Sequence, residues 1–471
     1  MFHVTGKGRH CAAAALLGLA PLSSVTHAQQ SKPGSAITSD SIGGGTVDFT
    51  YGGLGEYVAP YYLGPGPDAL YDPDQGEPQS LVPPLTQGTV FPGLQLPWTK
   101  GLASLRQDLY DKYGLTFSAS YQQATQYATQ VAPGVSDHWA IGGWAALGGT
   151  WTPVNRGTDW EGSLVVRTGW RGPIGDRPWP AVFGPLKLGS AWSSYEFTSW
   201  NGGLAVEDLF WEQHLGPGFS FRIGNQAPQA TLNTFRFKDA RNGFSASPMA
   251  FSETIPYPAF GAGISFRWRP IPGTGFYVNG VVNDMNGNPG QFGLDWGHIS
   301  SDQLFVGTEI GHIWRRPNGE FDLLAVNIFH AGTRDTFDPD ITPNKPGWGF
   351  KINAEKQRGQ VVGFASYTHN TAKGGGISTT FSGNTAYIGA AYLRPFDING
   401  EIALAGMWTR PFNNIFPGSG KRDQYGLETY WNIGLTPNST VTPGVQVIVH
   451  PSFNPNADVV VQPRLNYRVF F

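Results

Sequence analysis

Apolar and polar positions alternate over seven consecutive pairs in the last stretch of the chain, residues 458–471. One face is mostly apolar and ends on Phe471, whereas the other carries Arg464 and Arg468. A period of two is typical of a β-strand with one apolar side. Strands of soluble sandwiches usually have about 5–6 residues, so this longer segment favours the closing strand of a barrel with lipid outside and water inside.

The same alternation recurs in sixteen segments that cover most of the chain after residue 114. Short turns with Gly, Pro or Asn follow the even-numbered segments, and longer connections follow the odd-numbered ones, the longest being 172–202 and 227–258. A barrel gives this pattern when one rim faces the periplasm and the other the exterior. The predicted fold is all-β, a transmembrane antiparallel β-barrel of 16 strands, a size that encloses an aqueous channel. We predict the strands at 115–127, 139–152, 159–171, 203–215, 218–226, 259–270, 275–284, 303–314, 320–331, 347–357, 360–370, 383–394, 399–409, 424–436, 440–450 and 457–471.

Charged residues stay on one face of the third, sixth, tenth and fourteenth segments. A Lys or Arg that faces lipid at mid-bilayer costs about 2–4 kcal/mol, so a membrane barrel requires this segregation. Two other segments fit less well. In 320–331 the pattern predicts that Asn327 faces outward and His330 inward, and 203–215 is ambiguous around Glu207 and Asp208.

Aromatic residues near the predicted strand ends would form girdles at the two membrane interfaces. The alternative is that they fill the core of a large secreted soluble β-protein, a class that the composition fits almost as well. The strict alternation of short and long connections favours the barrel. The girdle residues are Trp139, Trp151, Trp160, Trp170, Trp314, Trp408, Tyr425 and Trp431.

The start of the chain predicts export. Residues 1–28 combine Lys7 and Arg9 with the apolar run 11–22 and a small-residue exit at Ala28, which is the pattern of a secretory signal peptide. The apolar run is too short to cross a bilayer as a helix. Residues 29–97 are rich in Gly and Pro and are interpreted as a periplasmic arm.

A short amphipathic helix is predicted at 98–114, before the barrel domain 115–471. Leu102, Leu105, Leu109 and Tyr113 share one helical face, and Gly114 is suited to end the helix.

Composition excludes several classes of function. Cys11 is the only cysteine and leaves with the signal, so the mature chain has no disulfide, thiol nucleophile or cysteine metal site. Loss of the signal takes the formal charge from −3 to −5, because it removes two positive charges and no negative ones, which argues against nucleic acid as a partner. The ten histidines form no His-Glu-x-x-His motif, and no Gly-x-Ser-x-Gly elbow is present. We expect no cofactor, no metal and no enzyme activity, although spacing alone does not exclude a barrel enzyme whose Ser, His and Asp meet only in space.

Ten short segments, which fall into seven groups along the chain, resemble the carbohydrate-selective porins of the OprB-type family. Each is weak alone, and their order and spacing together are fairly specific. They are 101–106 with 113–115, 212–213 with 221–224, 277–284, 308–311, 428–431, 442–446 with 450–451, and 463–465.

The resemblance implies passive diffusion of sugars, glucose and related carbohydrates, across the outer membrane of a Gram-negative cell. It also implies that the loops after the third and fifth strands fold inward to narrow the pore. Further expected partners are outer-membrane lipid and the barrel assembly machinery, which would engage the strand ending at Phe471. The sequence leaves open a monomer or a homotrimer, and a general or other-solute diffusion porin is the alternative function.

A pore for sugars needs hydrogen-bonding groups of both signs and flat aromatic surfaces, with binding weak enough for release. Charged side chains on inward faces and residues of the two long loops are therefore the candidates for substrate binding. Two alternatives stay open, a structural salt-bridge network for the wall charges and packing against the wall for the loop tryptophans. The wall candidates are Arg167, Arg222, Glu309, Lys351, Glu428 and Arg464, and the loop candidates are Trp192, Glu196, Trp200, Arg236, Lys238 and Arg241.

Overall fold

The computed structural model describes the chain from residue 88 to residue 470, with internal gaps, and all of this lies in one compact unit, Val47–Phe471. The predicted signal peptide, most of the predicted arm 29–97, and Phe471 lie outside the described residues. The described ranges are 88–94, 97–178, 180, 183–185, 187–192, 203–238, 242–250, 252–258, 260–271, 274–287, 294, 296–297, 299–316, 320–334, 345–373, 382–412 and 423–470.

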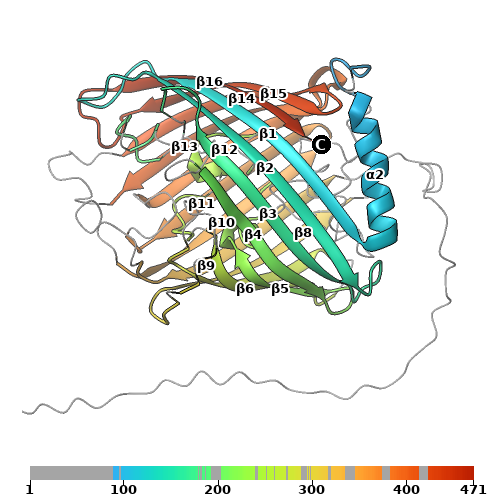
Figure 1. Ribbon diagram of the computed structural model, residues 1–471. Helices are drawn as coiled ribbons and strands as arrows, with labels where there is room; N and C mark the ends of the chain where they lie inside the picture. Colours follow the sequence, from blue (N-terminus) through green and yellow to red (C-terminus); the bar gives the residue numbers. More distant parts are fainter. Residues whose placement is uncertain are drawn as a thin grey trace, which may run out of the picture. The chain divides into compact units, whose positions relative to one another are not determined.

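Sixteen antiparallel strands of the described chain close into one barrel (Figure 1). Each strand pairs with its neighbours in sequence, and β1 pairs with β16, where Ser120 lies opposite Phe470 and Gln126 opposite Arg464. All sixteen predicted segments and the alternation of short and long connections are thereby confirmed. The strands are β1 (Leu115–Tyr127), β2 (Trp139–Val154), β3 (Gly162–Pro173), β4 (Gly203–His214), β5 (Phe219–Gln226), β6 (Gly261–Trp268), β7 (Phe276–Asp284), β8 (Leu304–Arg315), β9 (Phe321–Ala331), β10 (Gly347–Arg358), β11 (Val361–Asn370), β12 (Ser382–Leu393), β13 (Gly400–Pro411), β14 (Gln424–Thr436), β15 (Ser439–Val449) and β16 (Val459–Phe470).

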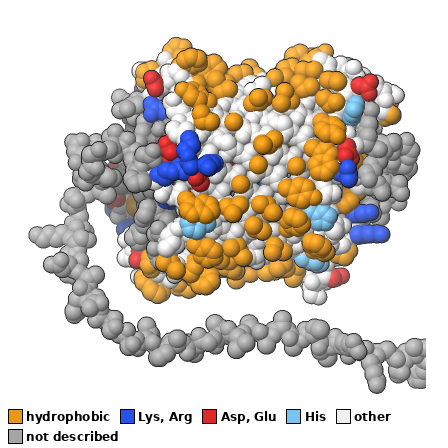
Figure 2. Space-filling view, turned by 180° about the vertical axis from the view of Figure 1, so that it is seen from behind, with side chains coloured by type: hydrophobic (Ala, Val, Ile, Leu, Met, Phe, Trp, Pro, Cys, Tyr) orange, Lys and Arg blue, Asp and Glu red, His pale blue; other side chains and the backbone are white. Residues whose placement is uncertain are grey.

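The two faces of the barrel wall differ as the alternation predicts. On β10, Trp348 and Ile352 point outward and are 55% and 41% exposed, whereas Lys351 between them is 0% exposed. Figure 2 shows apolar side chains spread over the outer face, with lysines and arginines gathered toward the two ends of the barrel. Apolar groups therefore face outward over most of the wall.

The prediction for β9 was wrong. Asn327 faces inward and is 1% exposed, whereas His330 lies on the outer, exposed face. The inner face of β9 also carries Phe329, which belongs to the same buried apolar cluster as Leu232 of the loop between β5 and β6. A lumen-side partner of this kind makes an apolar inner position stable, so polarity alone assigned the wrong face.

The ambiguity in β4 has a structural cause. The pairing of β3 with β4 shifts register between Arg167 and Thr168, because Arg167 lies opposite Asp208 and Thr168 opposite Val206. The extra residue, Glu207, forms a β-bulge, which lets two consecutive side chains point to the same side. Glu207 and Asp208 are accordingly both buried on the inner face, 1% and 5% exposed.

The apolar core lies inside the barrel. It is built largely from the two longest loops, β3–β4 and β5–β6, which pack against inward side chains of the wall. The β5–β6 loop contains the short helices η3 (Pro228–Ala230) and α3 (Ser247–Ala250). Its Phe244 contacts the rings of Phe364 on β11 and Tyr430 on β14, with centroids 5.7 and 4.8 Å apart. The described parts of both long loops thus fold inward, as the family resemblance implied.

The chain before β1 follows the rim that carries the short turns. The backbone N–H groups of Val90 and Phe91 donate to Gly434 and Leu435 at the end of β14. Helix α2 (Pro97–Tyr113) then leads into β1, close to the predicted 98–114. Its apolar face is not fully covered, since Leu105 is 47% exposed. Within the described part of the chain, we find no helix with the length and apolar character needed to span a membrane.

Candidate functional site

Glu309 on β8 binds the first half of the β5–β6 loop, which leads away from β5. Its Oε2 accepts the backbone N–H groups of Asn233 and Thr234 at 2.9 and 3.0 Å, and it is 0% exposed. Lys351 on β10 donates to the side chains of Asn233 and Ser252, the latter at 2.6 Å. The structure therefore brings Glu309 and Lys351 together through one loop residue, Asn233.

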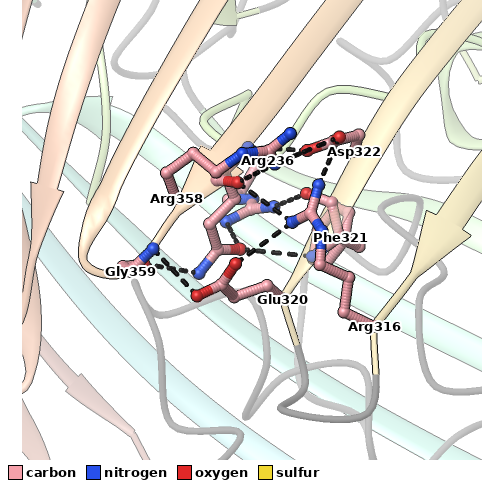
Figure 3. A network of polar contacts seen from close by, with 8 residues as sticks. Arg236, Arg316, Glu320, Phe321, Asp322, Arg358 and Gly359 are labelled. Atoms are coloured by element: carbon pink, nitrogen blue, oxygen red, sulfur yellow. Dashed lines mark hydrogen bonds and ion pairs between the residues drawn. The ribbon is translucent and has the colours of Figure 1, made fainter.

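Arg236 holds this loop at the rim that carries the short turns. Its backbone N–H donates to Glu355 at 2.8 Å, and its guanidinium donates to the side chain of Gln357 at 2.8 Å and lies 3.7 Å from the centroid of the Phe321 ring. Phe321 begins β9 and Gln357 nearly ends β10, so both belong to the short-turn rim (Figure 3). The β5–β6 loop starts and ends at the opposite rim, and hence it runs the full height of the wall.

Glu428 on β14 and Arg464 on β16 bind the second half of the loop, which leads back toward β6. Glu428 accepts the backbone N–H groups of Ser245 and Ala246 at 2.6 and 2.9 Å. Arg464 lies 3.2 Å from Glu428 and donates to the carbonyl of Gly243. Charge-assisted hydrogen bonds of this kind are about twice as strong as neutral ones. Wall carboxylates on three strands thus bind backbone amides of a single loop.

Trp192 of the β3–β4 loop packs against the wall. It is 1% exposed and its indole N–H donates to Gln446 on β15 at 3.4 Å. Gly426 on β14 gives it room, because a Cβ there would lie 2.7 Å from Cζ2 of the indole. Lys238, near the tip of the β5–β6 loop, donates to the carbonyl of Gln229 at 3.5 Å. Glu196, Trp200 and Arg241 lie outside the described residues.

A second charged group lines the opposite wall, on β3 to β6. Arg167 bridges the bulge, with its Nε 3.0 Å from Glu207 and its Nη2 2.9 Å from Asp208. Arg171 also pairs with Glu207 and stacks over Trp144 at 4.0 Å from the ring centroid. The bulge therefore concentrates two carboxylates between two arginines.

The same group continues toward the short-turn rim. Arg222 on β5 and Arg267 on β6 lie 3.3 and 3.7 Å from Glu212 on β4. Arg267 also donates to the carbonyl of Ala230, where the β5–β6 loop begins. The wall cluster, defined as Arg167, Arg171, Glu207, Asp208, Glu212, Arg222 and Arg267, carries four cations and three anions among the described residues.

The candidates from the sequence fall into these two groups. Arg167 and Arg222 belong to the wall cluster, whereas Glu309, Lys351, Glu428 and Arg464 contact the β5–β6 loop. Their role in a constriction stays a prediction, and the structure supplies their partners. The site residues that sequence reasoning left out are Arg171, Glu207, Asp208, Glu212 and Arg267 of the wall cluster and Glu355 on β10. The adjacent pair Glu207-Asp208 was the available signal, because two neighbouring carboxylates cannot both face inward in a regular strand.

Within the described ranges, no three His, Cys, Asp or Glu side chains are placed to hold a metal ion. The candidate site therefore consists of ion pairs on the barrel wall and of wall side chains that bind the β5–β6 loop.

The family model described as "Carbohydrate-selective porin, OprB family" matches residues 374–466. The resemblance to the OprB family is confirmed. The match covers β12 to β15 and most of β16, including Glu428 and Arg464. This family and the barrel fold imply an outer-membrane location and point to a channel rather than to an enzyme.

Two curated relatives are uncharacterised cyanobacterial proteins. One from Synechocystis sp. is 26% identical over 289 residues, which are 54% of this chain and 52% of that protein. One from Nostoc sp. is 22% identical over 285 residues, 55% of this chain and 48% of that protein. The chain therefore spans about half the length of these relatives.

Among solved structures, the barrel is similar to the high-pH structure of Pseudomonas putida OprB. The TM-score is 0.61 at 14% identity, over 78% of this chain and 96% of that chain. At this identity the likeness concerns the fold alone.

Proposed function

We propose that this chain is an outer-membrane porin through which small neutral sugars, such as glucose, diffuse passively into the periplasm. The observation that carries the proposal is the inward β5–β6 loop, which glutamates of β8, β10 and β14 anchor against one arc of the wall. Anchored in this way, the loop narrows the barrel, and it also contacts the wall cluster, because Arg267 donates to the carbonyl of Ala230. We infer that solutes pass beside the loop along this wall, next to Arg167, whose side chain is 12% exposed.

The chemistry of this passage suits neutral polar solutes. A sugar that enters a narrow pore loses water and needs both donors and acceptors in its place. The wall cluster offers both, because its guanidinium groups donate and its carboxylates accept. A wall with one charge sign would instead select ions, so the mixed signs favour a sugar over a small organic acid.

Fixed geometry supports weak, fast binding. Each arginine of the wall cluster already contacts a carboxylate, as in the pairs of Arg167 with Asp208 and of Arg222 with Glu212. A hydroxyl group can share such a pair, but it cannot displace the carboxylate. Transport by diffusion requires this balance, because tight binding would slow release.

The membrane placement of the barrel supports the same proposal. Outward aromatic residues near the strand ends, such as Trp139 and Trp314, 45% and 47% exposed, would lie at the two interfaces. The final strand, β16, would be the segment that the barrel assembly machinery binds. Export with cleavage of residues 1–28 completes the proposal, and a monomer or a homotrimer is compatible with it.

Single-channel recording in planar bilayers tests the function. We expect stepwise conductance with weak ion selectivity and a block by millimolar glucose that can be reversed. Conductance with strong ion selectivity and no effect of glucose would instead support the alternative, a diffusion porin for other solutes. A protein that inserts and forms no channel would contradict both.

A further inference from the structure

A group of charged residues lies on the outer side of the barrel, at the turns that join β8 to β9 and β10 to β11. Arg316 pairs with Glu320 at 3.1 Å and with Asp322, and Arg358 lies 3.3 Å from Asp322 (Figure 3). Lys356 is on the same outward face of β10 as Arg358, two residues earlier. These five residues are called the rim cluster.

The carboxylates of the rim cluster are occupied within the protein. Besides its arginine partners, Asp322 accepts the backbone N–H of Gln357 at 2.8 Å, and Glu320 accepts that of Gly359 at 2.8 Å. The cations are less fully used. Arg358 is 57% exposed and contacts described residues through Nη1 alone. Lys356 is exposed and makes no ion pair or hydrogen bond with the residues that the structure describes.

Lys356 has an acidic neighbour, Asp322 on β9, whose carboxylate pairs with Arg316 and Arg358, and apolar neighbours besides it. Leu324 on β9 and Val361 on β11 are 43% and 49% exposed on the same outer surface. The residue opposite Lys356 on β11 is Gly363, and a Cβ built there would meet nothing within 4 Å. The outer surface on β11 beside Lys356 is therefore open at Gly363. A cation on a lipid-facing surface is stable only where it can reach a charged or hydrated group.

The height of Lys356 on the wall fits the membrane interface. On the neighbouring strands, Asp322 lies opposite Trp314, which points outward and is 47% exposed. In the antiparallel pair of β10 with β9, Glu355 lies opposite Leu323. Lys356 comes directly after Glu355, and Asp322 directly before Leu323, so Lys356 lies at the level of Asp322. Tryptophan is enriched where acyl chains give way to headgroups. Lys356 and Arg358 thus lie at the level of lipid phosphates.

We propose that Lys356 and Arg358 form a binding site for the phosphate of an anionic phospholipid, with an acyl chain lying over Gly363. The proposal rests on the membrane placement given under the proposed function. Residues two apart on a strand are about 6.6 Å apart, which lets both side chains reach one phosphate group. In the proposed placement the short-turn rim faces the periplasm, so the site would contact lipids of the periplasmic leaflet.

Lipid retention by the purified full-length protein tests this site. Native mass spectrometry would count phosphatidylglycerol and phosphatidylcholine bound by the wild type, by Lys356→Gln and by the double variant Lys356→Gln/Arg358→Gln. The matched control is Lys345→Gln/Lys373→Gln, which removes two cations from the opposite rim, where these residues form a β-bridge. All variants are first checked for the shift in gel mobility on heating that marks a folded barrel.

The wild type is expected to retain phosphatidylglycerol in preference to phosphatidylcholine. The double variant should bind phosphatidylglycerol about 30-fold more weakly, since each basic residue near an anionic surface contributes about fivefold, and the control should match the wild type. Lys356→Gln alone should lose part of the affinity for phosphatidylglycerol. This single variant tests the proposal if the double variant does not fold. Equal retention in wild type and Lys356→Gln, or an equal loss in the control, would overturn the proposal.

Two further arms separate the sources of phosphate and the two proposals. Displacement of the lipid by millimolar inorganic phosphate would assign the site to free phosphate and overturn the lipid proposal. Glucose block is recorded on the same preparations. Its absence would contradict the sugar function without touching lipid retention, whereas loss of lipid preference with intact glucose block would overturn only the lipid site.

Discussion

Replacing Glu309 by Gln tests whether one wall carboxylate keeps the β5–β6 loop in place. The carboxylate receives five hydrogen bonds. Oε2 accepts from the backbone of Asn233 and Thr234 and from the side chain of Asn327, and Oε1 accepts from the Thr234 hydroxyl and from Tyr277 at 2.9 Å. Glutamine has nearly the same shape but replaces one acceptor with a donor.

The amide oxygen of glutamine can keep the Oε2 position and its three N–H donors, while the amide nitrogen takes the Oε1 position beside the Thr234 and Tyr277 hydroxyls, which can turn and accept. The cost is therefore that of the lost charge. A hydrogen bond to a charged group contributes about 1.5–3 kcal/mol against about 0.5–1.5 kcal/mol for a neutral one, so weakening the three N–H bonds should cost the attachment of the loop about 3 kcal/mol. The barrel itself should persist, because the ladder partners of Glu309 are backbone groups of β7 and β9.

Hydrogen exchange of the peptide that covers 231–238 measures this loss. If the amides exchange by local opening, a loss of about 3 kcal/mol speeds exchange by about 150-fold, and glucose block should weaken in parallel. The control is Glu161→Gln at the β2–β3 turn, whose carboxylate accepts only the Gly157 N–H among the bonds described, at 3.1 Å. Unchanged exchange at 231–238 in a folded Glu309→Gln barrel would refute the anchoring role.

Three further changes test other contacts. Gly426→Ala should displace Trp192 at a cost of about 1–3 kcal/mol, seen as faster exchange in 187–192, and slower exchange there would contradict the packing. Arg464→Met should cost about 3–5 kcal/mol because it leaves a buried carboxylate unpaired, whereas Arg410→Met at an exposed ion pair should cost less than about 1 kcal/mol; equal melting temperatures would contradict this. Arg167→Gln should make the channel more cation-selective, because it removes one positive charge beside two carboxylates, and an unchanged reversal potential in a KCl gradient would count against solute passage along this wall.

The strands were predictable because one face of each strand is turned to lipid and the other to the lumen. Residues such as Lys351 and Glu428 cannot face lipid, so alternation assigned them inward without knowledge of their partners. The same logic failed for Asn327, since the inner face of β9 also carries Phe329, which is buried in one apolar cluster with loop residue Leu232. A lumen that is partly filled has apolar positions on its inner wall, and the strand alone does not reveal them.

The partners of the candidate residues could not be predicted. Glu309 binds Asn233 and Thr234, which are joined to it only by the path of a long irregular loop. No periodicity marks those contacts, because backbone N–H groups are present in every sequence. The bulge at Glu207 was visible only as an ambiguity, and its pairing with Arg171 depends on the register of two strands.

The contacts between the barrel wall and the β5–β6 loop imply an order of events as the barrel folds. Glu309 lies 76 residues after Asn233, and Arg464 lies 221 residues after Gly243. Contacts of such separation form late and slowly, and the docking surface is incomplete until β16 is present. The nascent barrel must therefore mature with an undocked loop, and narrowing of the passage is the final event, after the last strand has met the first.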